Sequence, residues 1–217
     1  MIENCYKLTH NNIPLTFFDV STSAPWIINE IFFQNSYNLD HIQLSPGDIV
    51  IDIGANIGIL SIYLALKFQV KVLAFEPLPS NYAYLKKNIE ENKAYTVYPF
   101  PLAVTGDGRF LELRCMTENL GGANAYVTNE QPFMTAQASS ITLQHIFDSF
   151  SLDKVKLLKI DCEGGEYEIF QSTPQKYLKR IEYLIGEFHH LFGTEDPKPL
   201  LEQCRQIFGN KMQVQTI

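Results

Sequence analysis

Four acidic side chains lie at or beside the ends of short apolar segments: Asp52, Glu76, Asp161 and Glu187. Each segment is rich in β-branched and other apolar residues, which is typical of strands covered on both faces. The carboxyl ends of parallel strands form the edge of a sheet where ligands bind. Carboxylates there can bind hydroxyl groups, attract cations or accept a proton. We therefore expect these four acids to converge on one crevice.

A glycine-containing turn follows the first of these strands and indicates what the crevice binds. A dinucleotide fingerprint needs G-x-G-x-x-G, but Asn56 and Ile59 stand where the second and third glycines would be after Gly54. A G-x-x-x-x-G-K-[ST] phosphate loop is also missing from the sequence. Asp52 would repel a pyrophosphate but suits an amine. The turn from Gly54 to Gly58 therefore predicts a cationic, amine-bearing nucleoside, a description that S-adenosylmethionine fits.

Glu76 supports a nucleoside ligand. It ends a predicted strand at 70–75, about 20 residues after the glycine turn, where an acid commonly binds ribose hydroxyls. Each feature alone has an ordinary explanation: a glycine for a tight turn, Asp52 as a helix cap, Glu76 at the surface. Together, in a strand–turn–helix context, they favour the nucleoside.

The densest group of polar residues runs from Lys159 to Glu166 (KIDCEGGE). Asp161 and Glu163 are candidates for hydroxyl binding, proton acceptance or metal ligation. The alternative is that both acids cap the helix that follows. We expect Cys162 to be a packing residue, because a lone cysteine at the end of a strand usually packs in the interior.

His189 follows a predicted strand at 181–188 and is a candidate general base, because the pKa of histidine lies near physiological pH. The alternative is a solvated histidine at the start of a loop. Asp161, Glu163, Glu187 and His189 are also suitable ligands for a metal. Since no tight spacing such as H-x-x-x-H is present, the sequence favours a site without metal.

Alternating strands and helices must position these residues, and this alternation predicts an α/β fold with a mostly parallel central sheet and helices on both faces. The predicted strands are 49–53, 70–75, 95–104, 155–160, 181–188 and 212–216, and the predicted helices are 57–68, 79–92, 142–150, 165–171 and 197–208.

Two segments lie outside this alternation. Residues 1–45 form a lead-in, predicted as a hairpin and a helix capped by Ser23, which packs on the domain at 46–217. In the middle, 110–115 alternates like an edge strand, and 117–140 is predicted to be a long loop that covers the substrate. The aromatic residues Trp26, Tyr37 and Phe133 are candidates for lining an acceptor pocket, but we expect them to pack in the core.

Composition excludes several classes of function. The 217-residue chain is long enough for one domain, carries a net charge of −7 and has no cluster of basic residues, which argues against nucleic acid as a partner. No apolar run approaches the length of a membrane span, and the first residues lack a signal pattern. The four scattered cysteines suit reduced thiols, so the expected location is cytoplasmic. The sequence gives no indication of the oligomeric state.

The chain resembles the FkbM family of S-adenosylmethionine-dependent methyltransferases. The matching segments cover about 45–190 in the family's order: DIGANIG, AFEP with Asn81, PLAV, LLKIDCEGGEYEI and IGEFH. The resemblance implies the Rossmann-like class I methyltransferase fold and O-methylation of a hydroxyl on a small molecule such as a sugar, a glycolipid or a natural product. It implies Asp161, His189 and Glu163 as catalytic residues. The implied cofactor-binding residues are Asp52, Gly54, Asn56, Gly58, Glu76, Asn81, Ala103 and Asp161.

Two alternatives remain open from the sequence. One is another enzyme of this nucleoside type, such as an N-methyltransferase or a polyamine-forming transferase. The other is a catalytically inactive binding module of the same fold. Relatives usually end in a paired antiparallel hairpin, whereas only one candidate strand, 212–216, is found here. We therefore expect the domain to lack the last strand.

Overall fold

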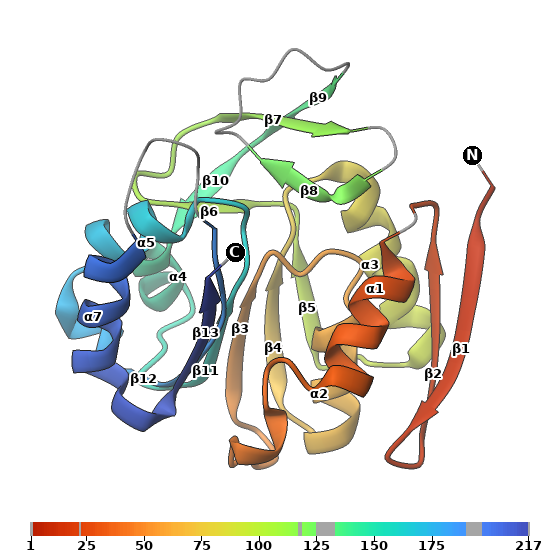
Figure 1. The fold of residues 1–217 in the computed structure, drawn as a ribbon, viewed down its shortest axis with the longest axis horizontal. Helices are drawn as coiled ribbons and strands as arrows, with labels where there is room; N and C mark the ends of the chain where they lie inside the picture. The colour runs from red at the N-terminus through yellow and green to blue at the C-terminus, as the bar shows by residue number, and fades with distance from the viewer. Residues whose placement is uncertain (1, 22, 117–118, 125–132, 190–196, 217) are drawn as a thin grey trace.

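A six-stranded sheet in which every neighbouring pair is parallel forms the centre of the molecule (Figure 1). The computed structural model describes residues 2–21, 23–116, 119–124, 133–189 and 197–216, and within 115–134 only the backbone. In spatial order the strands are β13 (Met212–Thr216), β12 (Ile181–Phe188), β11 (Val155–Ile160), β3 (Ile49–Ile53), β4 (Lys71–Phe75) and β5 (Val97–Phe100).

The side chains of this sheet alternate between two apolar cores. Val50 and Val72 belong to the core on one face, whereas Ile51 and Leu73, their neighbours in sequence, belong to the core on the other. All four are buried. A period of two with apolar residues on both faces is what a strand covered on both sides requires.

Helices supply the two covers (Figure 1). One core includes residues of α2 (Ile59–Phe68) and α3 (Pro79–Asn92). The other includes residues of α4 (Leu143–Ser149), α5 (Glu166–Ser172), α6 (Gln175–Leu178) and α7 (Pro197–Phe208). The predicted α/β fold is therefore confirmed. Among the described residues, no helix combines the length and apolar character needed to span a membrane.

The lead-in packs on the α2 and α3 side. It contains a hairpin of β1 (Asn4–His10) and β2 (Ile13–Asp19), then α1 (Ala24–Asn29), the π-helical turn η1 (Glu30–Gln34) and the 3-10 turn η2 (Leu39–His41). Ser23 occupies the N-cap position of α1 but makes no side-chain capping bond. Its hydroxyl instead lies 2.5 Å from that of Ser21, so the predicted N-cap position is confirmed but the side chain does not cap the helix.

The predicted strand at 95–104 is two strands in different sheets. The segment divides into β5 and β6 (Ala103–Thr105). Strand β6 pairs in parallel with β10 (Ser140–Thr142) and not with the main sheet. Pro101 lies in the break and has no N–H to continue a ladder of hydrogen bonds.

The middle of the chain forms a small antiparallel sheet instead of an edge strand followed by a loop. β7 (Leu111–Met116) is the central strand, with β8 (Asn119–Asn124) and β9 (Phe133–Ala138) on its two sides. Residues 117–140 are small and polar, so they lack the apolar alternation that indicates a strand. Pairing of their backbone with β7 does not need that alternation. In Figure 1 this sheet lies beyond the carboxyl ends of the parallel strands. Residues 117–118 and 125–132 of the predicted loop lie outside the described part.

Asn88 of α3 binds the lead-in to the core. Its Oδ1 accepts the N–H of Phe18 at 2.7 Å, and its Nδ2 donates to the carbonyls of Phe18 and Ile57. The side chain is fully buried, so Asn88→Ala leaves these groups without partners. We expect a loss of at least about 2 kcal/mol in the free energy of unfolding, measured in urea. The exposed Glu91→Ala on the same helix should change it by less than about 0.5 kcal/mol, and an equal effect of both variants would contradict this role.

Candidate active site

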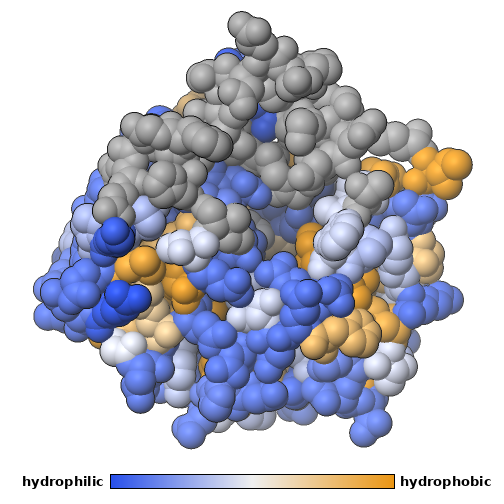
Figure 2. Space-filling model, viewed as in Figure 1, coloured by the Kyte–Doolittle hydropathy of each residue, from blue (hydrophilic) through white to orange (hydrophobic). Residues whose placement is uncertain are grey.

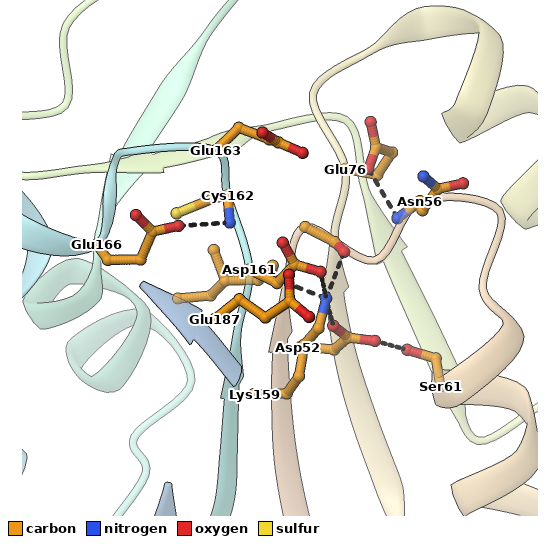
Figure 3. A network of polar contacts seen from close by, with 12 residues as sticks. Asp52, Asn56, Ser61, Glu76, Lys159, Asp161, Cys162, Glu163, Glu166 and Glu187 are labelled. Atoms are coloured by element: carbon orange, nitrogen blue, oxygen red, sulfur yellow. Dashed lines mark hydrogen bonds and ion pairs between the residues drawn. The ribbon is translucent and has the colours of Figure 1, made fainter. Parts of the chain in front are cut away.

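The candidate site lies where the strand order reverses, between β3 and β11. These strands are neighbours, with Ile53 opposite Ile160 at their ends. β3 leads toward α2 on one face and β11 toward α5 on the other, so the chain departs in opposite directions. That divergence opens a crevice at the carboxyl edge of an α/β sheet. Figure 3 shows the polar side chains that surround it.

The glycines of the turn after β3 are required by the protein's own packing. Gly54 has φ +76°, and a Cβ there would lie 1.8 Å from the backbone oxygen of Asp161. Gly58 has φ +89°, and a Cβ there would lie 2.5 Å from Leu85 Cδ1. Asn56 between them is also left-handed, with φ 52°. The turn is thus held tightly against β11, and its contact with a cofactor stays a prediction.

Lys159 is the central cation of the site, and the sequence analysis assigned it no role. Its Nζ donates to the carbonyl of Gly54 at 2.6 Å and lies 3.3 Å from Asp52 Oδ1 and 3.6 Å from Asp161 Oδ2. Burial alone would lower the pKa of Lys159, but the two carboxylates outweigh it and raise that pKa. The presence of a lysine near the end of an apolar strand is the sequence signal that could have indicated this role of Lys159.

Asp52 lies beneath the turn and is bound by the protein itself. It is almost completely buried, pairs with Lys159, and accepts a hydrogen bond from the Ser61 hydroxyl at 2.6 Å (Figure 3). Its negative charge is therefore largely offset, and it holds β3, β11 and α2 together. A direct contact with a cofactor amine remains a prediction.

Glu76 is buried at the end of β4, which rules out the surface alternative. Its Oε2 accepts the N–H of Asn56 at 2.8 Å, and its Oε1 accepts the N–H of Leu78 at 2.9 Å. Burial raises the pKa of Glu76 to about 7, against the opposing effect of these two bonds. Because each carboxylate oxygen accepts more than one hydrogen bond, Glu76 can still receive the hydroxyls of a ribose.

The two residues predicted to border an adenine are both buried near this end of the sheet. Asn81 lies in the first turn of α3, shortly after Glu76. Ala103 begins β6, and its N–H donates to the carbonyl of Ser139 at 2.9 Å. Their role toward a cofactor stays a prediction.

Glu166 organises the turn after β11, a role that the sequence analysis had given to Asp161 and Glu163 as the alternative to catalysis. It is fully buried, and its two oxygens accept the N–H groups of Cys162 at 2.9 Å and Gly164 at 3.0 Å. An acid in the first helical turn that reaches back to preceding N–H groups is related to the capping box, and this was the available signal.

His189 is enclosed rather than solvated, because only 13% of its side chain is exposed. Its Nδ1 lies 3.1 Å from Glu166 Oε1. Its Nε2 lies 3.6 Å from Glu163, 3.8 Å from Glu187 and 3.9 Å from Asp161. Burial would lower the pKa of His189, but the bond to Glu166 and the surrounding carboxylates raise it to about 9.

Two acids of this group are held at higher pKa than usual. Burial raises the pKa of Glu163, a residue with left-handed backbone (φ 55°), to about 7. Burial also raises the pKa of Glu187 to about 8, with contributions from Asp161 and from a hydrogen bond with Glu30. Glu30 belongs to the π-helical turn η1, so the lead-in reaches the crevice.

Tyr37 is a second residue of the lead-in that lies close to the crevice. Its phenol is buried, and burial together with Asp161 and Glu30 raises the pKa of Tyr37 well above its usual value. The backbone carbonyl of Ser36 accepts a hydrogen bond from Gln213 Nε2 of β13 at 2.9 Å. The core prediction therefore holds for Tyr37 but is wrong for Trp26, which is 76% exposed. The side chain of Phe133 lies outside the described residues.

The composition of the crevice suits a cationic ligand. Two cationic side chains, Lys159 and His189, face a larger set of carboxylates: Asp52, Glu76, Asp161, Glu163, Glu166 and Glu187. Carboxyl groups that outnumber the cations in this way favour a positively charged ligand and disfavour a pyrophosphate. The residues present thus fit a nucleoside that carries a sulfonium and an ammonium group.

Comparison with known proteins agrees with this chemistry. The family model of the methyltransferase FkbM domain matches residues 52–212. The methyltransferase sdnD of Sordaria araneosa is 26% identical, over 91% of this chain and 85% of its own length. The 31-O-demethyl-FK506 methyltransferase FkbM of Streptomyces tacrolimicus is 26% identical, over 79% of this chain and 76% of its own length.

Solved structures give only partial likenesses. The METTL16 methyltransferase domain is 15% identical, with a TM-score of 0.45, over 84% of this chain and 58% of its own. A precorrin-6y C5,15-methyltransferase of Geobacter metallireducens is 15% identical, with a TM-score of 0.40, over 67% of this chain and 54% of its own.

The chain belongs to the FkbM family of methyltransferases, because the family model spans most of its length. It therefore has the Rossmann-like fold of class I methyltransferases, and its cofactor is S-adenosylmethionine.

Lys159 provides a test of the site's framework. Lys159→Met would leave Asp52 buried without its ion pair, and we expect a loss of about 3–5 kcal/mol in the free energy of unfolding. Adding Asp52→Asn in a double variant should recover part of this loss, since the unpaired charge is then removed. The exposed Lys154→Met serves as control and should cost less than about 1 kcal/mol. A similar small cost for Lys159→Met in chemical denaturation would contradict the central role of this lysine.

Proposed function

We propose that the protein transfers a methyl group from S-adenosylmethionine to a hydroxyl group of a small molecule. The observation that carries the proposal is the convergence of Asp161, Glu163, Glu187 and His189 at the carboxyl edge beside the Gly54–Gly58 turn. It brings candidate proton acceptors next to the part of the fold that binds the cofactor in this family.

The first half of the crevice would hold the cofactor. Glu76 would accept the ribose hydroxyls, and its orientation is already fixed by two backbone N–H groups. The turn from Gly54 to Gly58 would border the ribose and the methionine portion, supported from below by Asp52. Asn81 and Ala103 would border the adenine. When bound, S-adenosylmethionine supplies an electrophilic methyl group.

The second half of the crevice would hold the acceptor. An alcohol is a weak acid, so its proton must be taken up during or after methyl transfer. His189 and Asp161 are the proposed acceptors of this proton, with Glu163 close to the His189 ring. Since the pKa of His189 is raised to about 9, only its neutral form can accept the proton, and the fraction in that form increases as the pH rises toward 9. Positioning the acceptor oxygen would contribute most of the remaining acceleration.

The choice of oxygen and of a small molecule has separate support. The Streptomyces tacrolimicus relative is a 31-O-demethyl-FK506 methyltransferase, a name that specifies methylation at an oxygen. The net charge of −7 disfavours nucleic acid, whose phosphates need clustered cations. A sugar, a glycolipid or another natural product is the proposed acceptor class. Cys5, Cys162 and Cys204 are free thiols, which suits the proposed cytoplasmic location.

Glu76 tests the cofactor side. Titration calorimetry should show binding of S-adenosylhomocysteine, the demethylated product, and no binding of NAD or ATP. Glu76→Gln removes a charged acceptor of two ribose hydroxyls and should weaken binding at least about tenfold. Glu90→Gln, an exposed change on α3, is the matched control and should leave binding unchanged. Binding of NAD without S-adenosylhomocysteine, or an unaltered dissociation constant for Glu76→Gln, would disprove this assignment.

His189 tests the acceptor side. A panel of hydroxyl compounds is first screened with radiolabelled S-adenosylmethionine to find a methyl acceptor. With that acceptor, His189→Gln and Asp161→Asn should each lower kcat by about 100- to 10,000-fold. His189→Gln should leave the affinity for S-adenosylhomocysteine nearly intact. The exposed His145→Gln in α4 should retain full activity. If both site variants keep the wild-type kcat, neither residue handles the proton.

A further inference from the structure

We propose that the acceptor half of the crevice binds a divalent cation of the Mg²⁺ and Mn²⁺ class between Asp161, Glu187 and His189. The inference deepens the proposed function. The role of the ion in the reaction rests on that function, whereas the binding of the ion does not. It differs from the expectation drawn from the sequence, which favoured a site without metal.

The three ligand atoms come from neighbouring strands and point to one place. Asp161 directly follows β11, and Glu187 and His189 lie at the end of the adjacent β12. One ligand atom from each lies within 4.8 Å of the others. The His189 Nε2 is 3.8 Å from Glu187 and 3.9 Å from Asp161. Figure 3 shows that the carboxylates of Asp161 and Glu187 lie close to one another.

The orientation of the His189 ring directs Nε2, the nitrogen that does not contact Glu166, toward Asp161 and Glu187. Both oxygens of the buried Glu166 already accept backbone N–H groups, so in the 3.1 Å contact with Glu166 the His189 Nδ1 is the donor. In a neutral ring, Nε2 then carries the lone pair and faces the carboxylates. A carboxylate that binds the second ring nitrogen is the usual support of a metal-bound histidine.

The distances around Nε2 are long for hydrogen bonds and suit an intervening cation. The contacts to Asp161 and Glu187 exceed 3.5 Å, so no direct bond joins these groups. Ligand atoms on an octahedral ion with bonds of about 2.1 Å lie about 3 Å apart. Small side-chain rotations that move each atom by about an ångström would bring the three atoms into that arrangement. Without an ion, a protonated His189 ring supplies the positive charge between these carboxylates, and the ion would replace its Nε2 proton.

The ligand types select the class of ion. Two carboxylates are hard oxygen donors, which suit Mg²⁺ and Mn²⁺, and one imidazole shifts the preference toward Mn²⁺. Three side-chain ligands would leave positions of a six-coordinate ion for water or the acceptor hydroxyl. A cation there would lower the pKa of a bound hydroxyl and so assist the loss of its proton. With the ion bound, Asp161 and His189 would serve as its ligands, and the adjacent Glu163 would accept the proton in their place. The ligands lie on two strands more than twenty residues apart in sequence, which is why no short spacing predicted them.

The binding of Mn²⁺ is measured directly, with no turnover required. The full chain is treated with EDTA, dialysed, and titrated with MnCl₂ while free Mn²⁺ is followed by electron paramagnetic resonance. The wild type should show one saturable site. His189→Gln and Glu187→Gln should each weaken it at least about tenfold, and Glu166→Gln about 10- to 100-fold. The exposed His145→Gln is the matched control for adventitious binding by histidine and should bind Mn²⁺ like the wild type.

Thermal unfolding of each protein provides a second measurement and a check on folding. Mn²⁺ should raise the Tm of the wild type and of His145→Gln, because an ion that binds the folded state alone stabilises it. The Tm of His189→Gln should not respond. The absence of a saturable site in the wild type, or equal affinity in His189→Gln, overturns the proposal and leaves a protonated His189 among the carboxylates.

Titration with S-adenosylhomocysteine in the same samples separates this proposal from the proposed function. Binding of S-adenosylhomocysteine without a Mn²⁺ site overturns the cation and leaves the methyltransferase reaction standing. A Mn²⁺ site without binding of S-adenosylhomocysteine supports the cation and overturns the proposed function.

Discussion

The buried ammonium of Lys159 is the interaction on which the rest of the site depends. It joins the Gly54 carbonyl of the turn, Asp52 of β3 and Asp161 after β11 at the point where the strand order reverses. Charges taken out of water are costly unless they are paired closely and hydrogen-bonded. Because these partners lie on different segments, their pairing fixes the segments relative to one another. The ion pairs of Lys159 therefore set the shape of the crevice between the two central strands.

The two halves of the crevice are organised by similar means. On the cofactor side, Glu76 accepts backbone N–H groups from two different loops. On the acceptor side, Glu166 accepts two N–H groups from a single turn and also binds the His189 ring. Each buried carboxylate thus satisfies backbone donors that would otherwise lack partners. In the proposed function, the hydrogen-bonding capacity that remains on Glu76 would serve the ribose, and that of Glu166 orients the His189 ring.

The strand-end rule found part of this site from the sequence, because parallel strands bring their carboxyl ends to one edge whatever the details of packing. Asp52, Glu76, Asp161 and Glu187 were predicted to converge on that basis. Ligand atoms of Asp161 and Glu187 do lie within 4.8 Å of one another, together with His189. Lys159 and Glu166 were not assigned roles. Their importance comes from burial and from partners in distant segments, and neither property can be read from a residue's neighbours in sequence.

The sequence by itself determined the α/β fold, the glycine turn after β3 and the class of cofactor, because periodicity, glycine spacing and strand ends are local features of the chain. Only the tertiary structure decided the pairing of β6 with β10, the antiparallel sheet within 111–138 and the approach of Glu30 to Glu187. Each of these depends on contacts between segments far apart in sequence. Their free energy comes from backbone pairing and burial in the folded chain, which leave no periodic signal in the residues themselves.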